Sequence, residues 1–402
     1  MSPVQLVNGA SAMRRAARSA ARTANHVVER LLDFDAHGEQ ILSAYLVVNP
    51  STPLGQHVQV ELHSLLEPIY EALATNQRSQ THLAEEEQAV RQALAQSANG
   101  ARAVAIFACT PAGLCVVTPL PVEVTPAAYW DSRPRLRPLL SLIDEYEKSL
   151  VVLVDQQTAR FFRVFLDQIE EIADVWDDVP GHHAQGGDAQ SNIARWHDES
   201  VRWHLRRVSN ALGEIADEEV VDRIVLGGNP EVISQLERLL PHRMRQRLAG
   251  QVTSTLFARP DEVLDRARAV LQAAERSYET RRVEELLNAQ ARGQAALGIE
   301  QVASAVTAGQ VLLLIADADI HASGLVCARC ELILPNAALD ICPACGGGLV
   351  VQPDFIEYLA ERVLQQGGRF EEVRGEAAER LISAAGGIAA LLRYPILQPE
   401  RS

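Results

Sequence analysis

Four of the six cysteines in this 402-residue chain form two Cys-x-x-Cys pairs, which constrain the fold more than any other feature. Eleven residues separate the first pair, Cys327 and Cys330, from the second pair, Cys342 and Cys345. This spacing lets four thiolates converge in a tetrahedron, the arrangement of a closed structural zinc site. Four sulfur ligands leave no open position for water, so the sequence predicts a zinc ribbon at 325–350 that holds structural Zn²⁺.

Composition limits the number of domains and the kinds of partner. At about 100 to 200 residues per domain, a chain of this length is expected to form three. The formal net charge of −15 argues against wholesale electrostatic binding to nucleic acid, so contact with RNA must come from local basic patches. The sequence has no run of 18 uncharged apolar residues and its N-terminus lacks the apolar core of a secretory signal. We therefore expect a cytoplasmic protein with no membrane partner.

The first predicted domain, residues 1–147, has the pattern of an α/β fold. A buried strand is expected over 41–49, followed by helices over 58–74 and 83–97. The runs AVAIFAC and GLCVVTPL then predict a hairpin with Cys109 and Cys115 on its two arms. Because a reducing cytosol disfavours disulfides, two small buried side chains explain these cysteines better than a bond between them.

The second predicted domain, residues 148–285, opens with the strand-like runs SLVVLVD, ARFFRVFLD and IEEIADV. They predict an antiparallel meander. After a Gly-rich loop and a helix, the strand VDRIVLGG leads into a helix capped by Asn229, and a further strand, QVTSTLF, precedes a long helix from Pro260 to Leu287. This order predicts a mixed sheet with helices.

The third predicted domain, residues 286–402, alternates helix and strand. Strands are expected at VLLLIAD, FEEV and GIAALLRY, with helices between them. The pattern predicts a small α/β sandwich with the zinc ribbon inserted after its first strand.

The segment from Gly181 to Arg207 carries the candidate reactive site. Gly186 and Gly187 permit positive φ and close backbone approach, and Gln190 offers one amide to orient a water or a carbonyl. The helix that follows repeats apolar residues at helical spacing, which predicts one face packed on a sheet. That set is Ile193, Trp196, Val201, Leu205, Val208, Leu212 and Ile215.

Basic residues near this segment are the candidates for contact with RNA. On the helix they are Arg195, Arg202 and Arg206; a second patch, HRMRQR, holds Arg243, Arg245 and Arg247. Two interpretations of the helical set stay open, because Asp198 and Glu199 are also spaced to pair with Arg202 on the helix surface. The six acids between Asp167 and Asp178 are expected to form a solvated edge. The first 28 residues, with four arginines and no acid, would be a basic tail or a further RNA contact.

The chain resembles the bacterial relatives of the archaeal and eukaryotic class I peptide release factors and of Pelota, a three-domain family. Four stretches carry the resemblance: VLVDQQTARFF, ARWHDESVRWHLRR, AGQVLLLIAD with the cysteine ribbon, and VLQQGGRFEEV with GGIAALLRY. They cover roughly residues 145–402. The N-terminal region fits by position and length, and it shows no counterpart of the motifs that read stop codons.

The resemblance implies that the protein acts at the decoding site of the ribosome, with tRNA and ribosomal RNA as partners. A translational GTPase partner stays open. Release factors use a Gly-Gly-Gln loop to help water attack the peptidyl-tRNA ester. Here the spacing Gly187-x-x-Gln190 is similar to the loop of the ankyrin-and-zinc-finger peptidyl-tRNA hydrolases. Carried over, Gln190 would position the water to free a stalled nascent chain. The alternative is a non-catalytic rescue or hibernation factor like Pelota or Balon.

Overall fold

The computed structural model describes most of the chain, in the ranges 5–6, 26–48, 57–95, 101–120, 122–145, 148–165, 168–177, 179, 189–219, 221–335 and 338–395. The chain forms two compact units. The first comprises Met1–Ala21 and Tyr146–Glu275, and the second comprises Arg22–Glu145 and Arg276–Ser402. The predicted α/β class is confirmed, and further division of the second unit into an N-terminal and a C-terminal domain stays a prediction.

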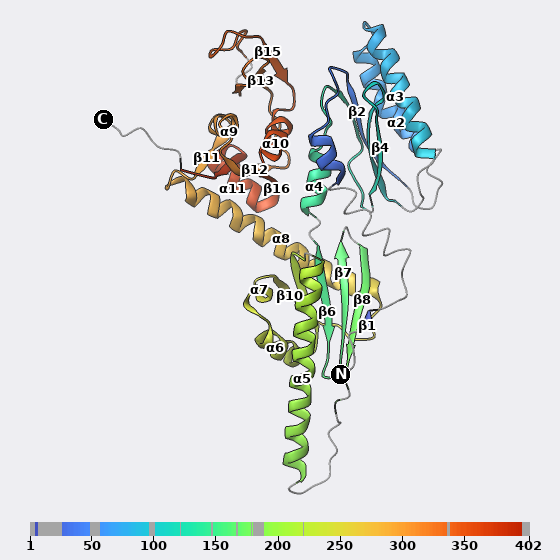
Figure 1. Ribbon diagram of the computed structural model, residues 1–402, viewed down its shortest axis with the longest axis vertical. Helices are drawn as coiled ribbons and strands as arrows, with labels where there is room; N and C mark the ends of the chain where they lie inside the picture. The colour runs from blue at the N-terminus through green and yellow to red at the C-terminus, as the bar shows by residue number, and fades with distance from the viewer. Residues whose placement is uncertain are drawn as a thin grey trace, which may run out of the picture. The chain divides into compact units, whose positions relative to one another are not determined.

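The first unit is built on a six-stranded sheet with the order β1-β8-β7-β6-β9-β10 (Figure 1). The predicted meander is present as antiparallel β6 (Ser149–Val154), β7 (Thr158–Phe165) and β8 (Gln168–Trp176). Strand β9 (Arg223–Gly228) runs parallel to β6, and β10 (Leu248–Val252) runs parallel to β9, so the sheet is mixed as predicted.

Two details of this sheet differ from expectation. The last strand begins at Leu248, three residues before the predicted QVTSTLF run, because Leu248 pairs with Ile224 of β9. The segment β1 (Gln5–Leu6) pairs antiparallel with β8 at Ala173 and Asp174. These two residues of the predicted basic tail therefore belong to the sheet, whereas its arginines lie outside the described residues.

Helices cover both faces of this sheet because β6 is apolar on both sides. Leu150, Val152 and Val154 pack in one core with α5 (Ala189–Glu218), α6 (Pro230–Leu239) and α7 (His242–Arg245). Val151 and Leu153 pack in a second core with the start of α8 (Pro260–Gln290). The strand's two-residue period therefore assigns each helix to a face.

The turn between β9 and α6 follows the sequence prediction. Asn229 Oδ1 accepts a hydrogen bond from the Glu231 N–H at 2.9 Å, which caps α6. Gly228 has φ +138°, and a Cβ there would lie 2.1 Å from the Val154 carbonyl oxygen. The helix cap thus accounts for Asn229, and the close approach to the Val154 carbonyl accounts for Gly228. Neither residue requires a bound phosphate to explain its position.

The N-terminal part of the second unit is a four-stranded antiparallel sheet with the order β4-β3-β2-β5. The strands are β2 (Ile41–Val47), β3 (Ala103–Cys109), β4 (Leu114–Leu120) and β5 (Ala127–Asp131). Helices α2 (His57–Ala72) and α3 (Gln77–Ala95) pack on one face, and helical residues 26–32 with α4 (Arg137–Glu145) pack on the other. The predicted hairpin is present through the 3-10 turn η1 (Thr110–Ala112). Cys109 is buried and Cys115 is exposed, contrary to the prediction that both are buried; both thiols are free.

The C-terminal part of the second unit is the predicted α/β sandwich. Its sheet has the order β11-β17-β12-β16, formed by β11 (Ala295–Leu297), β17 (Ile388–Leu392), β12 (Val311–Asp317) and β16 (Arg369–Val373). Helices α9 (Gly298–Thr307) and α10 (Phe355–Gln365) pack on one face. Helix α11 (Gly375–Ala385) and the end of α8 pack on the other. A three-stranded sheet is inserted between β12 and α10, with strands β13 (Gly324–Cys327), β14 (Ile333–Leu334) and β15 (Leu349–Gln352).

Within the second unit, α4 joins the two sheets through buried polar contacts that the sequence did not predict. The Glu357 carboxylate accepts hydrogen bonds from the backbone N–H groups of Leu136 at 2.6 Å and Arg137 at 3.0 Å. The Arg137 side chain pairs with Glu372 and donates to the Ala318 carbonyl oxygen at 2.7 Å. Burial raises the pKa of Glu357 to about 8, more than these N–H donors and nearby Arg135 lower it.

Candidate functional site

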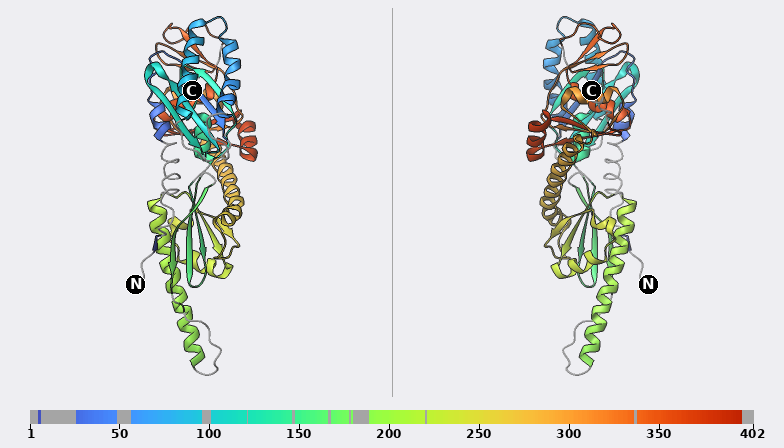
Figure 2. Two further views of the ribbon diagram at one scale, coloured as in Figure 1. Left: turned by 90° about the vertical axis from the view of Figure 1, so that its right-hand side faces the viewer. Right: turned by 90° about the vertical axis from the view of Figure 1, so that its left-hand side faces the viewer.

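Helix α5 carries the candidate reactive residues at its start. Gly186 and Gly187 lie outside the described residues. Gln190 is the second residue of α5; its backbone is helical, and its side chain is outside the described part of the chain. At 1.5 Å per residue, a helix of 30 residues is about 45 Å long. Its N-terminal half extends beyond the ends of the strands of the sheet on which its C-terminal half packs (Figures 1 and 2).

From Val201 onward α5 matches the predicted apolar face, and at Trp196 it does not. Val201, Leu205, Val208, Leu212 and Ile215 are buried as predicted. For Trp196 the prediction is wrong, because its side chain is 61% exposed. The side chain of Ile193, the remaining member of the set, lies outside the described part of the chain. The period is helical throughout, but Trp196 lies outside the buried face, whereas the next residue, His197, is 5% exposed.

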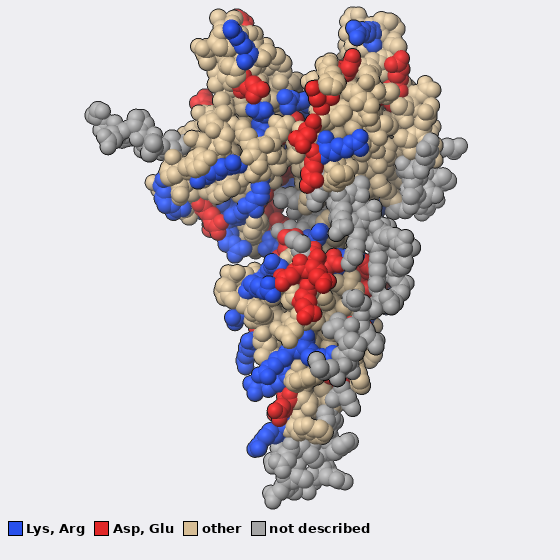
Figure 3. Space-filling model, in the orientation of Figure 1, with Lys and Arg blue, Asp and Glu red and all other residues tan. Residues whose placement is uncertain are grey.

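The three predicted arginines of α5 share one exposed stripe. With 3.6 residues per turn, Arg195, Arg202 and Arg206 lie within about 40° of one another around the helix axis. All three are exposed, and none has an ion-pair partner among the residues that the structure describes, including Asp198 and Glu199. The structure thus does not contain the surface pairing that was the alternative interpretation. Figure 3 shows basic side chains gathered over α5 in this unit.

The second basic patch lies on α7, where buried Met244 anchors the helix to the core shared with α5. Arg243 pairs with Asp217 of α5 at 2.8 Å, and both side chains are partly exposed. Arg245 is exposed, whereas Arg247 is half-buried. The structure therefore brings both basic sets into the first unit, with the charge of Arg243 partly offset by Asp217.

The acidic run before the loop is engaged in ion pairs, so the expectation of a solvated edge is wrong for three of its members. Glu171 pairs with Arg160 at 2.6 Å, and Glu170 pairs with Arg163. Asp177, beyond the end of β8, accepts from two residues of α5. Its Oδ2 lies 2.7 Å from Nδ1 of fully buried His204, and its Oδ1 contacts Arg207. Cross-strand partners and a helix distant in sequence neutralise these carboxylates.

An open pocket beside α5 was not predicted from the sequence. It has a volume of about 270 Å³ and is lined by Asp177, Val179, Trp196, Glu199, Ser200 and Trp203. The signal that would have located it is a repeat of Arg-Trp-His at seven-residue spacing, at 195–197 and 202–204.

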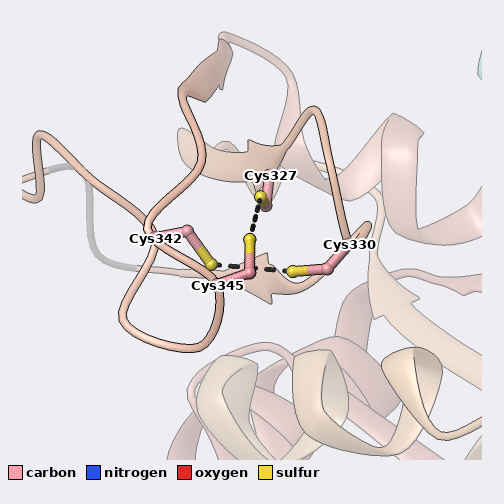
Figure 4. A group of neighbouring side chains, drawn as sticks. All are labelled: Cys327, Cys330, Cys342 and Cys345. Carbon is pink, nitrogen blue, oxygen red and sulfur yellow. Dashed lines mark hydrogen bonds between the residues drawn. The ribbon is translucent and has the colours of Figure 1, made fainter.

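The four cysteines of the ribbon converge as the spacing predicted (Figure 4). All four sulfurs lie within 4.8 Å of one another. The Cys327 and Cys345 sulfurs are 3.4 Å apart, and those of Cys330 and Cys342 are 3.6 Å apart. A tetrahedron with Zn–S bonds of about 2.3 Å has sulfurs about 3.8 Å apart. The four sulfurs are therefore close enough to hold one metal ion.

Backbone groups support the cluster. The N–H groups of Cys330 and Arg329 donate to Cys327 Sγ and lower its pKa to about 6, which favours the thiolate that a metal binds. Gly346 has φ +68°, so the chain makes a left-handed turn directly after Cys345. At Gly347 a Cβ would lie 3.2 Å from Cys345 Sγ and 3.3 Å from Cys327 Sγ, so the backbone approaches both sulfurs closely.

Among the described residues, no helix is both long and apolar enough to cross a membrane.

Comparison with known proteins identifies a family for the middle of the chain. Residues 134–274 match the model of "Bacterial archaeo-eukaryotic release factor family 10". Peptide chain release factor subunit 1 of Methanocaldococcus jannaschii is 26% identical over 301 residues, which cover 67% of this chain and 71% of that protein. Its counterpart in Archaeoglobus fulgidus is 25% identical over 289 residues, covering 66% and 70%.

Solved structures that match the chain include an archaeal translation termination factor, aRF1, and Dom34 of S. cerevisiae. The first is 18% identical with a TM-score of 0.26, covering 93% of this chain and 98% of that chain. The second is 15% identical with a TM-score of 0.42, covering 71% and 75%. The sequence matches show that residues 134–274 are similar to the bacterial archaeo-eukaryotic release factors, and that about two thirds of the chain is similar to archaeal peptide chain release factors.

Proposed function

We propose that this protein binds the ribosome and hydrolyses the ester that joins a nascent peptide to tRNA. The proposal is supported by the family of the middle segment and by the Gly187-x-x-Gln190 spacing at the start of α5. Such a factor works in the cytoplasm on ribosomes that hold an unreleased peptide.

The reaction depends more on orienting the water and the ester than on acid or base groups of the protein. Water attacks the carbonyl carbon of the ester, the bond from that carbon to the ribose oxygen breaks, and a proton passes to the ribose oxygen. The products are a peptide with a free carboxylate and a tRNA with a free hydroxyl. In this scheme the Gln190 amide orients the water, while Gly186 and Gly187 let the backbone approach the tRNA terminus.

One observation carries the proposal most directly. Gln190 stands in the first turn of a 30-residue helix whose N-terminal half extends past its sheet and carries arginines without ion-pair partners among the described residues. A projecting, basic helix is suited to carry an amide to a target surrounded by phosphate.

A second candidate function is non-catalytic occupation of the ribosome in rescue or dormancy. Two observations favour it. The sequence reads Gly187-Asp188-Ala189-Gln190 where a release factor has Gly-Gly-Gln, and the backbone of Gln190 is already helical. Asp188 also adds a negative charge close to the amide.

For the ribbon, we propose that the four cysteines hold Zn²⁺ as a structural ion. The donor set and the sulfur separations fit tetrahedral zinc, which would fix β13 and the loop to β15 in one arrangement.

Peptide release from ribosome-bound peptidyl-tRNA tests the main proposal. We expect Gln190→Ala to lower the release rate about 100-fold or more, the typical loss of a positioned catalytic hydrogen-bonding group, while cosedimentation with ribosomes persists. Gln272→Ala, at an exposed glutamine of α8 in the same unit and outside both basic sets, is the matched control.

The outcomes separate the two candidates. Ribosome binding by wild-type protein with no release at saturation would contradict the hydrolase and support the non-catalytic factor. Failure of the wild type to bind ribosomes would contradict both.

A further inference from the structure

Helix α5 contains a short internal repeat between residues 195 and 204. Arg195-Trp196-His197 is followed seven residues later by Arg202-Trp203-His204. Seven residues are nearly two helical turns, so each position of the repeat returns to the same face about 10.5 Å farther along the axis. The arginines are exposed in both copies and the histidines are buried, at 5% and 0% exposure. The fold therefore builds the same side-chain arrangement twice.

The two tryptophans lie on the boundary between these faces. Their side chains are 61% and 51% exposed, although burial of an indole would favour folding. Each sits about 100° around the helix from the arginine that precedes it, so a stripe of tryptophans runs beside the stripe of arginines. Packing among the described residues of the first unit does not account for indoles held in this position.

The pocket of about 270 Å³ lies between the tryptophans and the end of β8. Trp196 and Trp203 line it together with Glu199 and Ser200 of the same helix, and Asp177 and Val179 close it from the segment after β8. Two flat aromatic side chains in one pocket suit a flat ring better than a flexible chain.

Charges around the pocket also select its occupant. The Arg207 guanidinium lies 5.4 Å from the centroid of the Trp203 ring, and it pairs with Asp177, which His204 also contacts. These partners offset the negative charge of the Asp177 carboxylate. Glu199 is then the carboxylate of α5 that can accept hydrogen bonds from a molecule in the pocket. A carboxylate accepts hydrogen bonds from the amino groups of bases, and the neighbouring arginine stripe suits a phosphate backbone.

We infer that this pocket binds an unpaired nucleobase of RNA, stacked on Trp196 and Trp203, with its phosphates along Arg195, Arg202 and Arg206. Stacking on aromatic side chains beside a basic track is how proteins hold single-stranded nucleic acid. The inference rests on the proposed function only in taking RNA as the partner. Glu199 gives the pocket a preference for bases with an exocyclic amine, such as cytosine, over uracil.

Binding of short single-stranded RNA to the full-length protein tests the inference without ribosomes. Stacking contributes enough that Trp196→Ala or Trp203→Ala should weaken binding roughly tenfold or more, and Trp→Phe at either position should restore much of it. Trp176→Ala is the matched control, because Trp176 is 56% exposed at the end of β8 and does not line the pocket.

The ligand supplies a second control. An oligonucleotide with abasic positions should bind the wild type about as weakly as the normal oligonucleotide binds the alanine variants. Oligocytidine should bind more tightly than oligouridine, and Glu199→Gln should reduce that difference. Far-ultraviolet circular dichroism confirms that each variant remains helical.

Several results would overturn the inference. They are equal affinity of wild type and both alanine variants, equal affinity for abasic RNA, and an equal reduction of affinity in Trp176→Ala. A wild type that binds no RNA but captures a peptide in this pocket would do the same. Ribosome cosedimentation in parallel separates the two ideas: a wild type that binds ribosomes but shows no tryptophan dependence sinks only the base pocket.

Discussion

The four-cysteine cluster of the second unit and the N-terminal part of α5 in the first unit differ in where the contacts of their functional groups come from. Every group of the cluster comes from one short segment, and backbone N–H groups of that segment point at the sulfurs. On α5, by contrast, Arg195, Arg202, Arg206, Trp196 and Trp203 are exposed. The first region needs only the proposed metal ion to complete it; the second presents its groups to solvent, where a partner can reach them. Changes at the cluster should therefore affect folding, and changes at the helix should affect binding.

Removal of a cysteine should have the largest effect. Cys330→Ser should lower bound zinc from one ion per chain to well below one, because apparent zinc binding energies of such sites are on the order of 10 kcal/mol. Elemental analysis measures the metal, and hydrogen exchange should show residues 325–350 losing protection while β6 to β9 keep theirs.

The exposed free thiol gives the control for this experiment. Cys115→Ser should keep the metal, since Cys115 is not in the cluster. Two results would contradict the expected contrast between the cluster and α5. One is wild-type protein that contains no zinc, and the other is an equal loss of metal in the Cys330 and Cys115 variants.

A pH series should give an intermediate effect, confined to the second unit. Burial raises the pKa of Glu357 to about 8, so the folded state holds a proton that the unfolded state releases above its usual value near 4.5. Stability from this group is therefore present below the unfolded value and is lost as the pH rises through 8. We expect the free energy of unfolding to fall by about 1 kcal/mol per pH unit from pH 5 to 8.

Denaturant unfolding at several pH values, read by hydrogen exchange at α4 and α10, measures this effect. Glu357→Gln should flatten the dependence, and Glu300→Gln, exposed on α9, should leave it unchanged. The same slope in the Glu357 variant would show that another group titrates.

The smallest effect on stability is expected at the α5 stripe. Replacing Arg195, Arg202 and Arg206 by alanine should change the free energy of unfolding by less than about 0.5 kcal/mol, the usual range for surface sites. Binding should respond instead: the slope of log affinity against log salt for single-stranded RNA should fall by about 0.7 for each phosphate that is no longer neutralised.

Arg266→Ala is the matched control for the stripe, because Arg266 is an exposed arginine of α8, which covers the opposite face of the same sheet. An unchanged salt slope in the triple variant would mean that these arginines do not bind RNA. A marked decrease in stability would mean that the stripe serves the fold, and the contrast between the two regions would fail.

Local patterns in the sequence were sufficient for the elements whose partners are close along the chain. The meander of β6, β7 and β8, the Asn229 cap and the convergence of the cysteines all depend on residues a few turns or one hairpin apart. The apolar face of the packed half of α5 was also correct, because helical spacing determines which residues share a side.

Only the tertiary structure decided where those patterns end and what meets across the fold. Helical spacing placed Trp196 with the buried residues, but in the folded protein its side chain is exposed. The acids before the loop resembled a solvated edge until Arg160, Arg163 and His204 were brought against them.

The buried contacts of α4 show the same limit, since Arg137 and Glu372 are separated by 235 residues. Spacing along the chain specifies which side chains share a face, because backbone geometry is periodic. It does not specify what covers that face, because burial and pairing depend on segments that only folding brings together. The sequence by itself therefore determined which four cysteines converge and the order of strands and helices, and the three-dimensional fold decided that Arg195, Trp196, Arg202 and Trp203 of α5 are exposed.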